Sequence, residues 1–191
     1  MTDSTRETIV RCQQGDLTAF DELVRSHQAY AFGLALRLLH NEIEAEDVTQ
    51  EAFVKAWRHI DRFDPNRKFT TWLYKIVVNL CLDMIRARKN ARRLFSPIET
   101  IPTNLEPTDR NDPMESQSNW ELCQLIRDIT ADLAVTQRLV FTLRDLENLS
   151  IQEVCEITGL SVASVKTNLH YARKNIRAVL ATRYDVRERL P

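Results

Sequence analysis

Aromatic and basic side chains are mixed in one stretch of this 191-residue chain, between residues 67 and 93. Its first part places three rings beside two cations: Arg67, Lys68, Phe69, Trp72 and Tyr74. Its second part carries five cations and no acid after Asp83: Arg86, Arg88, Lys89, Arg92 and Arg93. Rings stack on unpaired bases and cations hold phosphates, so the stretch fits a surface for single-stranded nucleic acid. An ordinary core helix with a solvated basic end fits these residues equally well.

A second set of polar residues follows a predicted helix-turn-helix. Ser150 with Glu153 forms a capping box that begins a short helix, Gly159 supplies a turn, and Ser161 caps a longer helix. The longer helix turns polar side chains outward: Ser164, Lys166, Thr167, Asn168, His170 and Tyr171. Lys and Asn read guanine and adenine edges, while the later Arg173, Lys174 and Arg177 suit phosphates. The alternative is a plain helical hairpin with a solvated face.

Acidic residues gather in a third place, the outer face of a predicted helix from Ile43 to Ile60. Glu44, Asp47 and Glu51 recur there at helical spacing. The net charge of −1 therefore hides an acidic block and an acid-free basic block between residues 162 and 183. Segregated charge of this kind predicts two partners, one basic and one polyanionic.

No residue pattern predicts catalysis. The chain has no phosphate-binding glycine loop, no HExxH and no serine elbow, so we expect neither an enzyme nor a cofactor. Its four cysteines form no CxxC pair and have no histidine at ligand spacing, which argues against a metal site and a disulfide framework. The polar N-terminus and the lack of a long apolar run predict a cytoplasmic protein without membrane insertion.

Helical periodicity positions all these residues, and the chain has only three glycines, so we expect an all-α protein. The predicted helices include one that Asp16 caps and that Asn41 and Glu42 break, 69–93 capped by Thr70 or Thr71, and 136–146. Four prolines and many acids between residues 95 and 118 predict a flexible linker. The expected organisation is two small helical domains, 1–94 and 119–191, joined by that linker, with the helix-turn-helix in the second.

Three segments in this order resemble the extracytoplasmic-function (ECF) class of bacterial sigma factors. They are AEDVTQEAFVKAWRHIDRFD, then KFTTWLYKIVVNLCLDMIR, and, after the linker, TQRLVFTLRDLENLSIQEVCEITGLSVASVKTNLHYARK. The resemblance covers nearly the whole chain apart from the linker and the last residues.

The resemblance implies a role for each surface. The first domain would dock on core RNA polymerase through Asp47, Gln50, Glu51, Phe53, Lys55 and Trp57. It would capture a flipped base of the −10 element and hold the melted strand through Arg67, Lys68, Phe69, Thr70, Thr71, Trp72, Lys75, Asn79, Arg86, Arg88 and Lys89. The second domain would read the −35 element as duplex through Ser164, Lys166, Thr167, Asn168, His170, Tyr171, Arg173 and Lys174. The resemblance also implies an anti-sigma factor as regulator.

The longer helix of the helix-turn-helix lacks two cations that are frequent in the family, at Asn168 and Tyr171. Members often carry Gly-Thr-Val-Lys-Ser-Arg where this chain has Ala163 to Asn168, and Tyr171 stands where a further arginine is frequent. The usual −35 preference of the family is therefore not expected to apply. Two other hypotheses are a free-standing regulator that uses only the helix-turn-helix and a protein adaptor that does not bind DNA.

Overall fold

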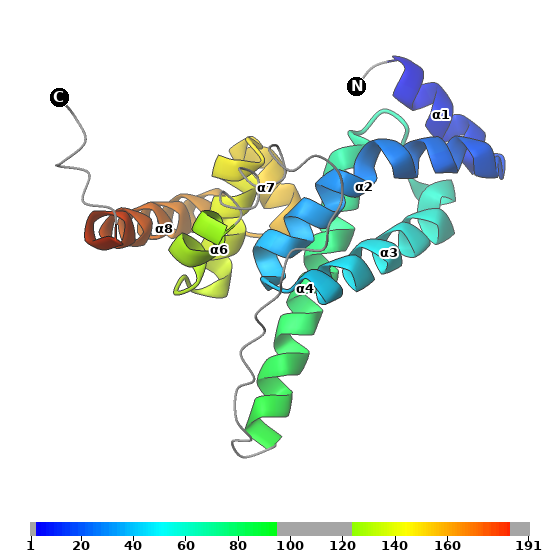
Figure 1. Cartoon of the computed structure of the whole chain (residues 1–191). Coiled ribbons are helices and arrows are strands. Elements are labelled where there is room, and N and C mark those ends of the chain that lie inside the picture. Colours follow the sequence, from blue (N-terminus) through cyan, green and yellow to red (C-terminus); the bar gives the residue numbers. More distant parts are fainter. Residues whose placement is uncertain (1–2, 95–123, 184–191) are drawn as a thin grey trace, which may run out of the picture.

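The computed structural model describes residues 3–94 and 124–183, and every regular element in these ranges is helical (Figure 1). In chain order the elements are α1 (Asp3–Gln13), α2 (Leu17–Leu39), α3 (Glu42–His59), the 3₁₀ turn η1 (Ile60–Arg62), α4 (Phe69–Leu94), α6 (Val135–Phe141), the π-helical turn η2 (Thr142–Leu146), α7 (Ile151–Thr158) and α8 (Val162–Arg183), and residues 124–130 are also helical. The all-α prediction is confirmed. The predicted linker, 95–118, lies outside the described residues.

Helices α2, α3 and α4 pack against one another, and α1 packs on α2 (Figure 1). The predicted cap Asp16 accepts from the backbone of Thr18 and Ala19 at the start of α2. Asn41, which the sequence had not indicated as a cap, begins α3 by accepting from Glu44 N at 3.0 Å. Buried apolar residues at helical spacing, such as Leu73 and Val77 of α4, fill the space between these helices.

Helix α4 begins at Phe69, but the predicted threonine cap is wrong. The backbone N–H of Trp72 donates to the carbonyl of Lys68 at 3.3 Å, so both threonines already lie inside the first turn. Thr71 is buried, and its hydroxyl has no hydrogen-bond partner. A cap must precede the first helical residue, which leaves that position to Lys68.

The helix-turn-helix forms as predicted. Glu153 N donates to Ser150 Oγ at 3.2 Å, and Glu153 Oε2 accepts from Ser150 N at 2.9 Å, which completes the capping box. Gly159 ends α7 at φ 72°, a left-handed conformation that glycine adopts without strain. Ser161 Oγ then accepts from Ser164 N at 3.2 Å at the start of α8. The predicted helix 136–146 is regular only to Phe141 and continues as the π-helical turn η2.

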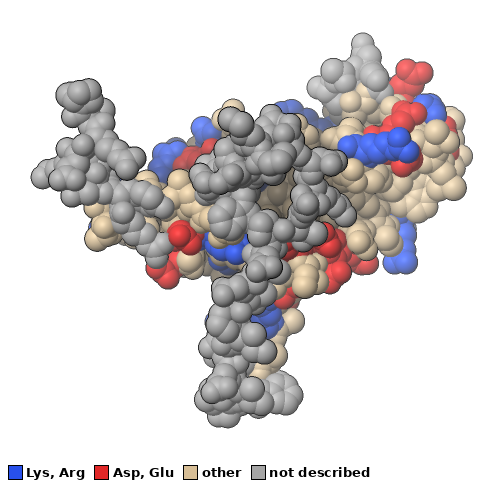
Figure 2. Space-filling view, in the orientation of Figure 1, with Lys and Arg blue, Asp and Glu red and all other residues tan. Residues whose placement is uncertain are grey.

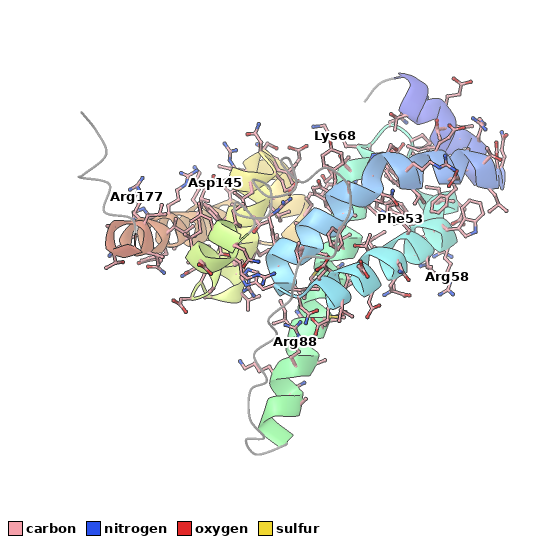
Figure 3. The ribbon with its side chains drawn as sticks, in the orientation of Figure 1. Phe53, Arg58, Lys68, Arg88, Asp145 and Arg177 are labelled. Atoms are coloured by element: carbon pink, nitrogen blue, oxygen red, sulfur yellow. The ribbon has the colours of Figure 1, made fainter. Side chains whose placement is uncertain are left out.

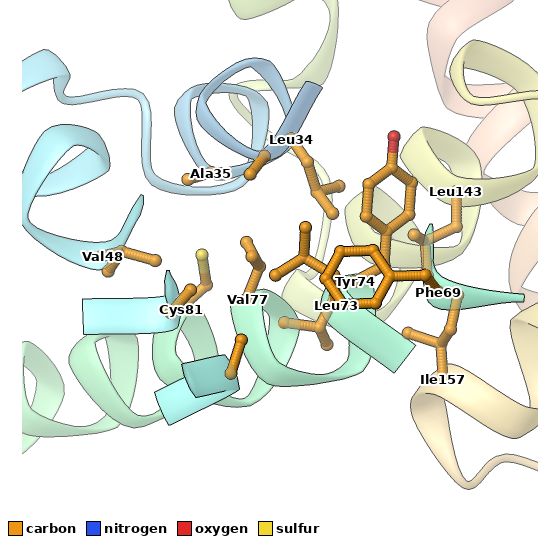
Figure 4. Packing of buried hydrophobic residues seen from close by; sticks show 14 of the residues in the cluster. Leu34, Ala35, Val48, Phe69, Leu73, Tyr74, Val77, Cys81, Leu143 and Ile157 are labelled. Atoms are coloured by element: carbon orange, nitrogen blue, oxygen red, sulfur yellow. The ribbon is translucent and has the colours of Figure 1, made fainter. Parts of the chain in front are cut away.

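The N-terminal and C-terminal helices lie side by side, with α7 against α4 and with α6 and η2 against α2 (Figure 1). One buried cluster contains residues of both parts (Figure 4). Leu143 and Ile157 from the C-terminal part join Leu34, Leu73 and Val77 from the N-terminal part. The spacing of residues within each helix did not predict this contact.

Candidate nucleic-acid interface

The loop that leads into α4 is fixed by polar contacts from α1 and from within the loop. The Gln13 amide donates to the carbonyls of Ile60 and Phe63 at 2.9 and 2.7 Å. The Asp64 carboxylate accepts from Asn66 N at 3.0 Å and from the Asn66 side-chain amide at 2.9 Å, and these two bonds lower the pKa of Asp64. The loop therefore presents Arg67 and Lys68 at a defined position next to α4.

Four rings pack together at the start of α4, but they are not equally open. Phe69 is 2% exposed, and its ring contacts His27, Phe63 and Trp72. The half-buried Trp72 leans on Phe63, with ring centroids 4.9 Å apart. Tyr74 is also buried. Of the three rings singled out from the sequence, only Trp72 is partly accessible, and the buried Phe69 ring packs against it.

An open groove of about 1000 Å³ lies beside Trp72. It is lined by Arg62, Phe63, Asp64, Arg67, Lys68, Thr71, Trp72, Lys75, Ser150, Glu153 and Glu156. We call this the α4–α7 groove, because its walls come from the loop and α4 on one side and from α7 on the other. Thr71 contributes to this lining, but its unpartnered hydroxyl oxygen is itself buried. A ring and several cations are the groups that bind a base with its phosphates.

Two cations of the groove are already paired with acids of α7. Lys68, which is labelled in Figure 3, has its Nζ 2.7 Å from Glu153 Oε1. Arg67 NH1 lies 3.1 Å from Glu156 Oε1. The Lys68 ammonium, together with Ser150, lowers the pKa of Glu153 to about 2. These pairs join residues 85 and 89 positions apart, and nothing in the sequence pattern indicated them.

The remaining predicted −10 residues divide into open and engaged positions. Lys75, Asn79 and Lys89 are exposed on α4, and Thr70 is half-buried. Arg86 forms an ion pair with Asp83 at 2.9 Å. Arg88 turns back to pair with Glu44 of α3 and also donates to Leu39 O at 3.4 Å, so it ties α4 to the α2–α3 turn.

The predicted −35 residues lie on α8. Lys166, Thr167, His170, Tyr171 and Lys174 are exposed. Ser164 and Asn168 are half-buried, and Asn168 Nδ2 donates to Ser164 O at 2.9 Å. A second groove of about 440 Å³ runs along α8 and is lined by Arg144, Ile151, Lys166, Leu169, His170, Arg173, Lys174 and Arg177.

Two arginines of this second groove change the predicted set of −35 residues. One was not predicted, and the other is held by an acid. Arg144 comes from η2, so only the packing of η2 beside α8 brings it to the site, and sequence reasoning missed it. Arg173 is held by two bonds to Asp145 at 2.7 and 2.8 Å, which raise its pKa further (Figure 3). Arg173 is thereby fixed in one orientation, as bidentate pairs are.

The acidic face of α3 is open. Asp47, Gln50 and Glu51 are exposed, and Lys55 lies 3.9 Å from Glu51. Figure 2 shows acidic side chains, in red, along α3. Phe53, by contrast, is buried, and the half-buried Trp57 packs on Phe20 with centroids 4.9 Å apart. Phe53 therefore supports the face from inside, whereas Trp57 keeps part of its surface exposed.

Two apolar side chains of the α3 face were missed. Ile43 is 62% exposed and Val54 is 41% exposed, at the two ends of the acidic stretch. Their spacing relative to Asp47 and Gln50 follows one helix face, which is the signal that identifies them.

None of the helices in the described ranges is long and apolar enough to cross a membrane. Within the same ranges, no group of three His, Cys, Asp or Glu side chains is placed to hold a metal ion.

Comparison with known proteins identifies the family. The family model for sigma-70 region 2 matches residues 23–91, and the model for sigma-70 region 4 matches residues 123–176. The ECF RNA polymerase sigma factor SigW of Bacillus subtilis is 34% identical over 180 residues, which cover 92% of this chain and 96% of that protein. The ECF RNA polymerase sigma-E factor of Escherichia coli K12 is 32% identical over 173 residues, with 88% and 90% covered.

The solved structure of CnrH in complex with the cytosolic domain of CnrY has the same fold, with a TM-score of 0.69 and 27% identity. It covers 95% of this chain and 99% of that one. The sigma factor RpoE of Bartonella quintana, in complex with the anti-sigma factor NepR, also has a TM-score of 0.69, over 86% of this chain and 98% of that one, at 19% identity. The sequence resemblance is thus confirmed, and this chain belongs to the ECF family of RNA polymerase sigma factors.

Proposed function

We propose that this chain is a promoter-specificity subunit that binds core RNA polymerase, recognises a −10 and a −35 element, and promotes opening of the DNA. One observation carries the proposal above others. Trp72 and the cations on the α4 side of the α4–α7 groove lie in the part that matches sigma region 2, while the basic groove of α8 lies in the part that matches region 4. A single-strand surface and a duplex surface in one chain suit a protein that opens DNA.

At the −10 element, Trp72 stacks on an unpaired base while Lys75 and Asn79 follow the strand along α4. These three side chains recur at helical spacing and so share one face of the helix. Capture of an extruded base offsets part of its unstacking cost of a few kcal/mol.

At the −35 element, the start of α8 enters the major groove with Lys166, Thr167 and His170 toward base edges. Arg144, Lys174 and Arg177 then contact phosphates and add affinity without sequence information. Asn168 reaches a base only after it gives up its bond to Ser164 O.

Core polymerase binds α3. The exposed acids Asp47 and Glu51 suit a basic partner, and the exposed Ile43 and Val54 add apolar contact at both ends. Such a mixed surface combines electrostatic steering with buried apolar area.

The chain divides into a region 2 domain (1–94), a linker (95–118) and a region 4 domain (119–191). Its role is recognition, without a catalytic step, and it acts where the cytoplasmic RNA polymerase acts. We also propose that an anti-sigma factor regulates it, by analogy with CnrH, which binds the cytosolic domain of a second protein.

Reconstitution with purified bacterial core RNA polymerase tests the function. Co-elution of the chain with core enzyme, together with run-off transcripts from a pool of host promoters, is the expected result. A chain that ignores core enzyme and shifts duplex DNA by itself would be a free-standing regulator, and the proposal would be wrong.

A further inference from the structure

Side chains from three other segments surround the end of α2. His40, which follows α2, has its Nδ1 3.5 Å from Nη1 of Arg138 in α6. The Nε2 atom of the same ring lies 3.2 Å from the Thr130 hydroxyl. Figure 1 shows α6 beside the end of α2, and the two helices are in contact. We call the set that meets here the α2-end cluster, and it consists of His40, Arg88, Arg127, Thr130 and Arg138.

The hydrogen bonds of the α2-end cluster follow one direction and leave His40 neutral. Thr130 Oγ1 donates to Ile126 O at 2.6 Å, so it accepts from the Nε2–H group of His40. The Nδ1 atom of His40 then carries no proton and accepts from Arg138. Burial, followed by the charges of the three arginines, lowers the pKa of His40 to about 4, which agrees with a neutral ring. Arg138 therefore faces an uncharged imidazole instead of a carboxylate.

Arg138 is a half-buried cation whose charge has no counterpart. Within residues 3–94 and 124–183, its side chain forms one hydrogen bond, to His40, and no carboxylate pairs with it. Its Nε atom is buried and has no partner. Burial, followed by the charge of Arg88, lowers the pKa of the Arg138 guanidinium. A buried charge without an opposite charge is strongly unfavourable, so this position needs an explanation.

The neighbouring arginines increase the imbalance. Arg88 pairs with Glu44 of α3 and donates to the carbonyl of Leu39, so it already provides the cation that the end of α2 favours. Arg127 is half-buried, acts on His40 through its charge, and forms no ion pair in the described part of the chain. The charges of Arg127 and Arg138 therefore remain, and together they amount to two positive charges.

The outer edge of the Arg138 guanidinium is the group that a ligand would meet. Nη1 is used by His40, which leaves Nε and Nη2, and these two parallel donors match two oxygens of one oxyanion. We propose that the α2-end cluster binds a phosphate group, with Arg138 donating to two of its oxygens and Arg127 supplying the second positive charge. A phosphate monoester carries about 1.5 to 2 negative charges at pH 7, whereas a carboxylate carries one.

This site is separate from both grooves that we assign to DNA. His40, Arg127 and Arg138 line neither the α4–α7 groove nor the groove along α8. The phosphate group belongs either to a small soluble molecule or to the DNA backbone, which share the chemistry that the guanidinium recognises. The experiments below distinguish these two sources.

The first test uses the full-length chain and inorganic phosphate as the probe. Urea unfolding is followed by circular dichroism in a phosphate-free buffer that contains added phosphate, chloride or acetate at one ionic strength. About 10 mM phosphate should raise the ratio of folded to unfolded chain about tenfold relative to chloride, as a site with a Kd of about 1 mM does. Acetate should have no such effect, and an equal effect of acetate would overturn the assignment to phosphate.

Arg138→Met should respond in opposite ways in the two solutions. In chloride the variant should be at least as stable as the wild type, because an apolar side chain replaces an unmatched buried charge. In phosphate its ratio of folded to unfolded chain should not rise further. Arg58→Met is the matched control, since Arg58 is exposed on α3 and outside the cluster, and it should keep the full response to phosphate. A variant at Arg138 that loses stability in chloride and keeps the phosphate response would show that Arg138 is merely structural.

The Arg138 Nε–H group provides a second readout that does not depend on unfolding. Its signal in a ¹H–¹⁵N spectrum of the arginine side chains is identified by its loss in Arg138→Met, and it should shift with phosphate until the site is saturated. The exposed Arg58 again serves as the control. Equal shifts of both signals would mean non-specific binding, and an unshifted Arg138 signal would mean no binding, so either result would overturn the proposal.

Duplex DNA, added without phosphate, identifies the source of the group. A shift of the Arg138 signal by the duplex, lost in Arg138→Met together with part of the DNA affinity, would assign the site to the DNA backbone. A signal that responds to phosphate but not to the duplex would assign it to a small molecule. These measurements need neither polymerase nor promoter opening, so their failure would leave the proposed function untouched.

Discussion

The hydroxyl of Tyr74 in α4 donates a hydrogen bond to Oε2 of Glu147, 73 residues further along the chain, across 2.9 Å. Burial, first, and then the nearby carboxylate raise the pKa of Tyr74, so the hydroxyl keeps its proton and remains a donor. This bond connects the helix that carries Trp72 to the segment that precedes the helix-turn-helix. It is one of the contacts through which the two parts of the chain form one structure.

Tyr74→Phe should weaken this connection without removing the ring from the core. Glu147 then keeps Arg37 but loses one hydrogen bond, which costs about 1 to 2 kcal/mol because the acceptor is charged. Urea unfolding followed by circular dichroism measures the change. Tyr30→Phe is the control, since Tyr30 is 61% exposed, and equal losses in both variants would remove the assigned role of the Tyr74 hydroxyl.

Acid should weaken the packing between the N-terminal and C-terminal parts through protonation of His40. His40 ends α2 and lies between Thr130, 3.2 Å from Nε2, and Arg138, 3.5 Å from Nδ1. Burial, followed by the charges of Arg138, Arg127 and Arg88, lowers its pKa from 6.5 to about 4. Because the folded pKa is depressed, the neutral imidazole stabilises the fold above pH 6.5, and this stability is lost as pH falls toward 4.

The lowering of the His40 pKa from 6.5 to about 4 changes the free energy of unfolding by at most about 3 kcal/mol. His40→Asn keeps a residue that tolerates the left-handed φ of 56° but cannot titrate. The pH dependence of the unfolding free energy between 6.5 and 5 should therefore flatten in this variant. The pKa of Glu153 is about 2 in the folded protein, so the stability that this carboxylate contributes is lost only as pH falls below 4.5, outside this range. A wild-type slope that His40→Asn leaves intact would show that another group titrates.

Trp72→Ala should slow promoter opening in the holoenzyme, since base–aromatic stacking contributes about 1–3 kcal/mol. This corresponds to a loss of roughly 5- to 100-fold in the equilibrium for opening. A fluorescent base analogue in the −10 element reports the step, and Trp72→Phe, which keeps a ring, is the control. Binding of duplex DNA by α8 should stay nearly the same, and an unaltered opening rate would exclude Trp72 from the role.

Asp47→Arg together with Glu51→Arg should abolish binding to core polymerase. Both side chains are exposed on α3, so the reversal of charge should leave the fold intact by circular dichroism. Co-elution with core enzyme is the measurement, and Asp21→Arg on α2 is a control at a comparably exposed acid. Val54→Ser should weaken binding by a smaller factor because it removes only apolar area. Retained co-elution of the double variant would place the polymerase contact elsewhere.

Local sequence determined the helices and the family. Asp16 and Ser150 accept hydrogen bonds from backbone groups a few residues away, and Gly159 adopts a left-handed backbone conformation, so these residue types are enough to locate where their helices begin and end. The helix-turn-helix followed from the same local rules, and the order of three motifs indicated the ECF sigma factors. The threonine cap was predicted wrongly because Thr70 and Thr71, which lie within the first turn of α4, are of the same residue type as a helix cap.

The tertiary structure decided which members of each set are open. Helical spacing places Phe69 and Trp72 in the same aromatic group, but only packing against Phe63 and His27 buries Phe69 and leaves Trp72 accessible. Arg88 likewise belongs to the basic end of α4 by sequence, yet its partner is Glu44 of another helix. Residue spacing defines a face, whereas the neighbour of that face depends on how the helices pack.

The pairing of Arg37 with Glu147, and of Lys68 with Glu153, depends entirely on how the helices pack. These partners are separated by more than eighty residues, and no local rule relates the charge of one to the charge of the other. The sequence by itself thus indicated two candidate DNA-binding surfaces and an acidic face. Only the packing of α7 on α4 brought the acids of one part onto the cations of the other.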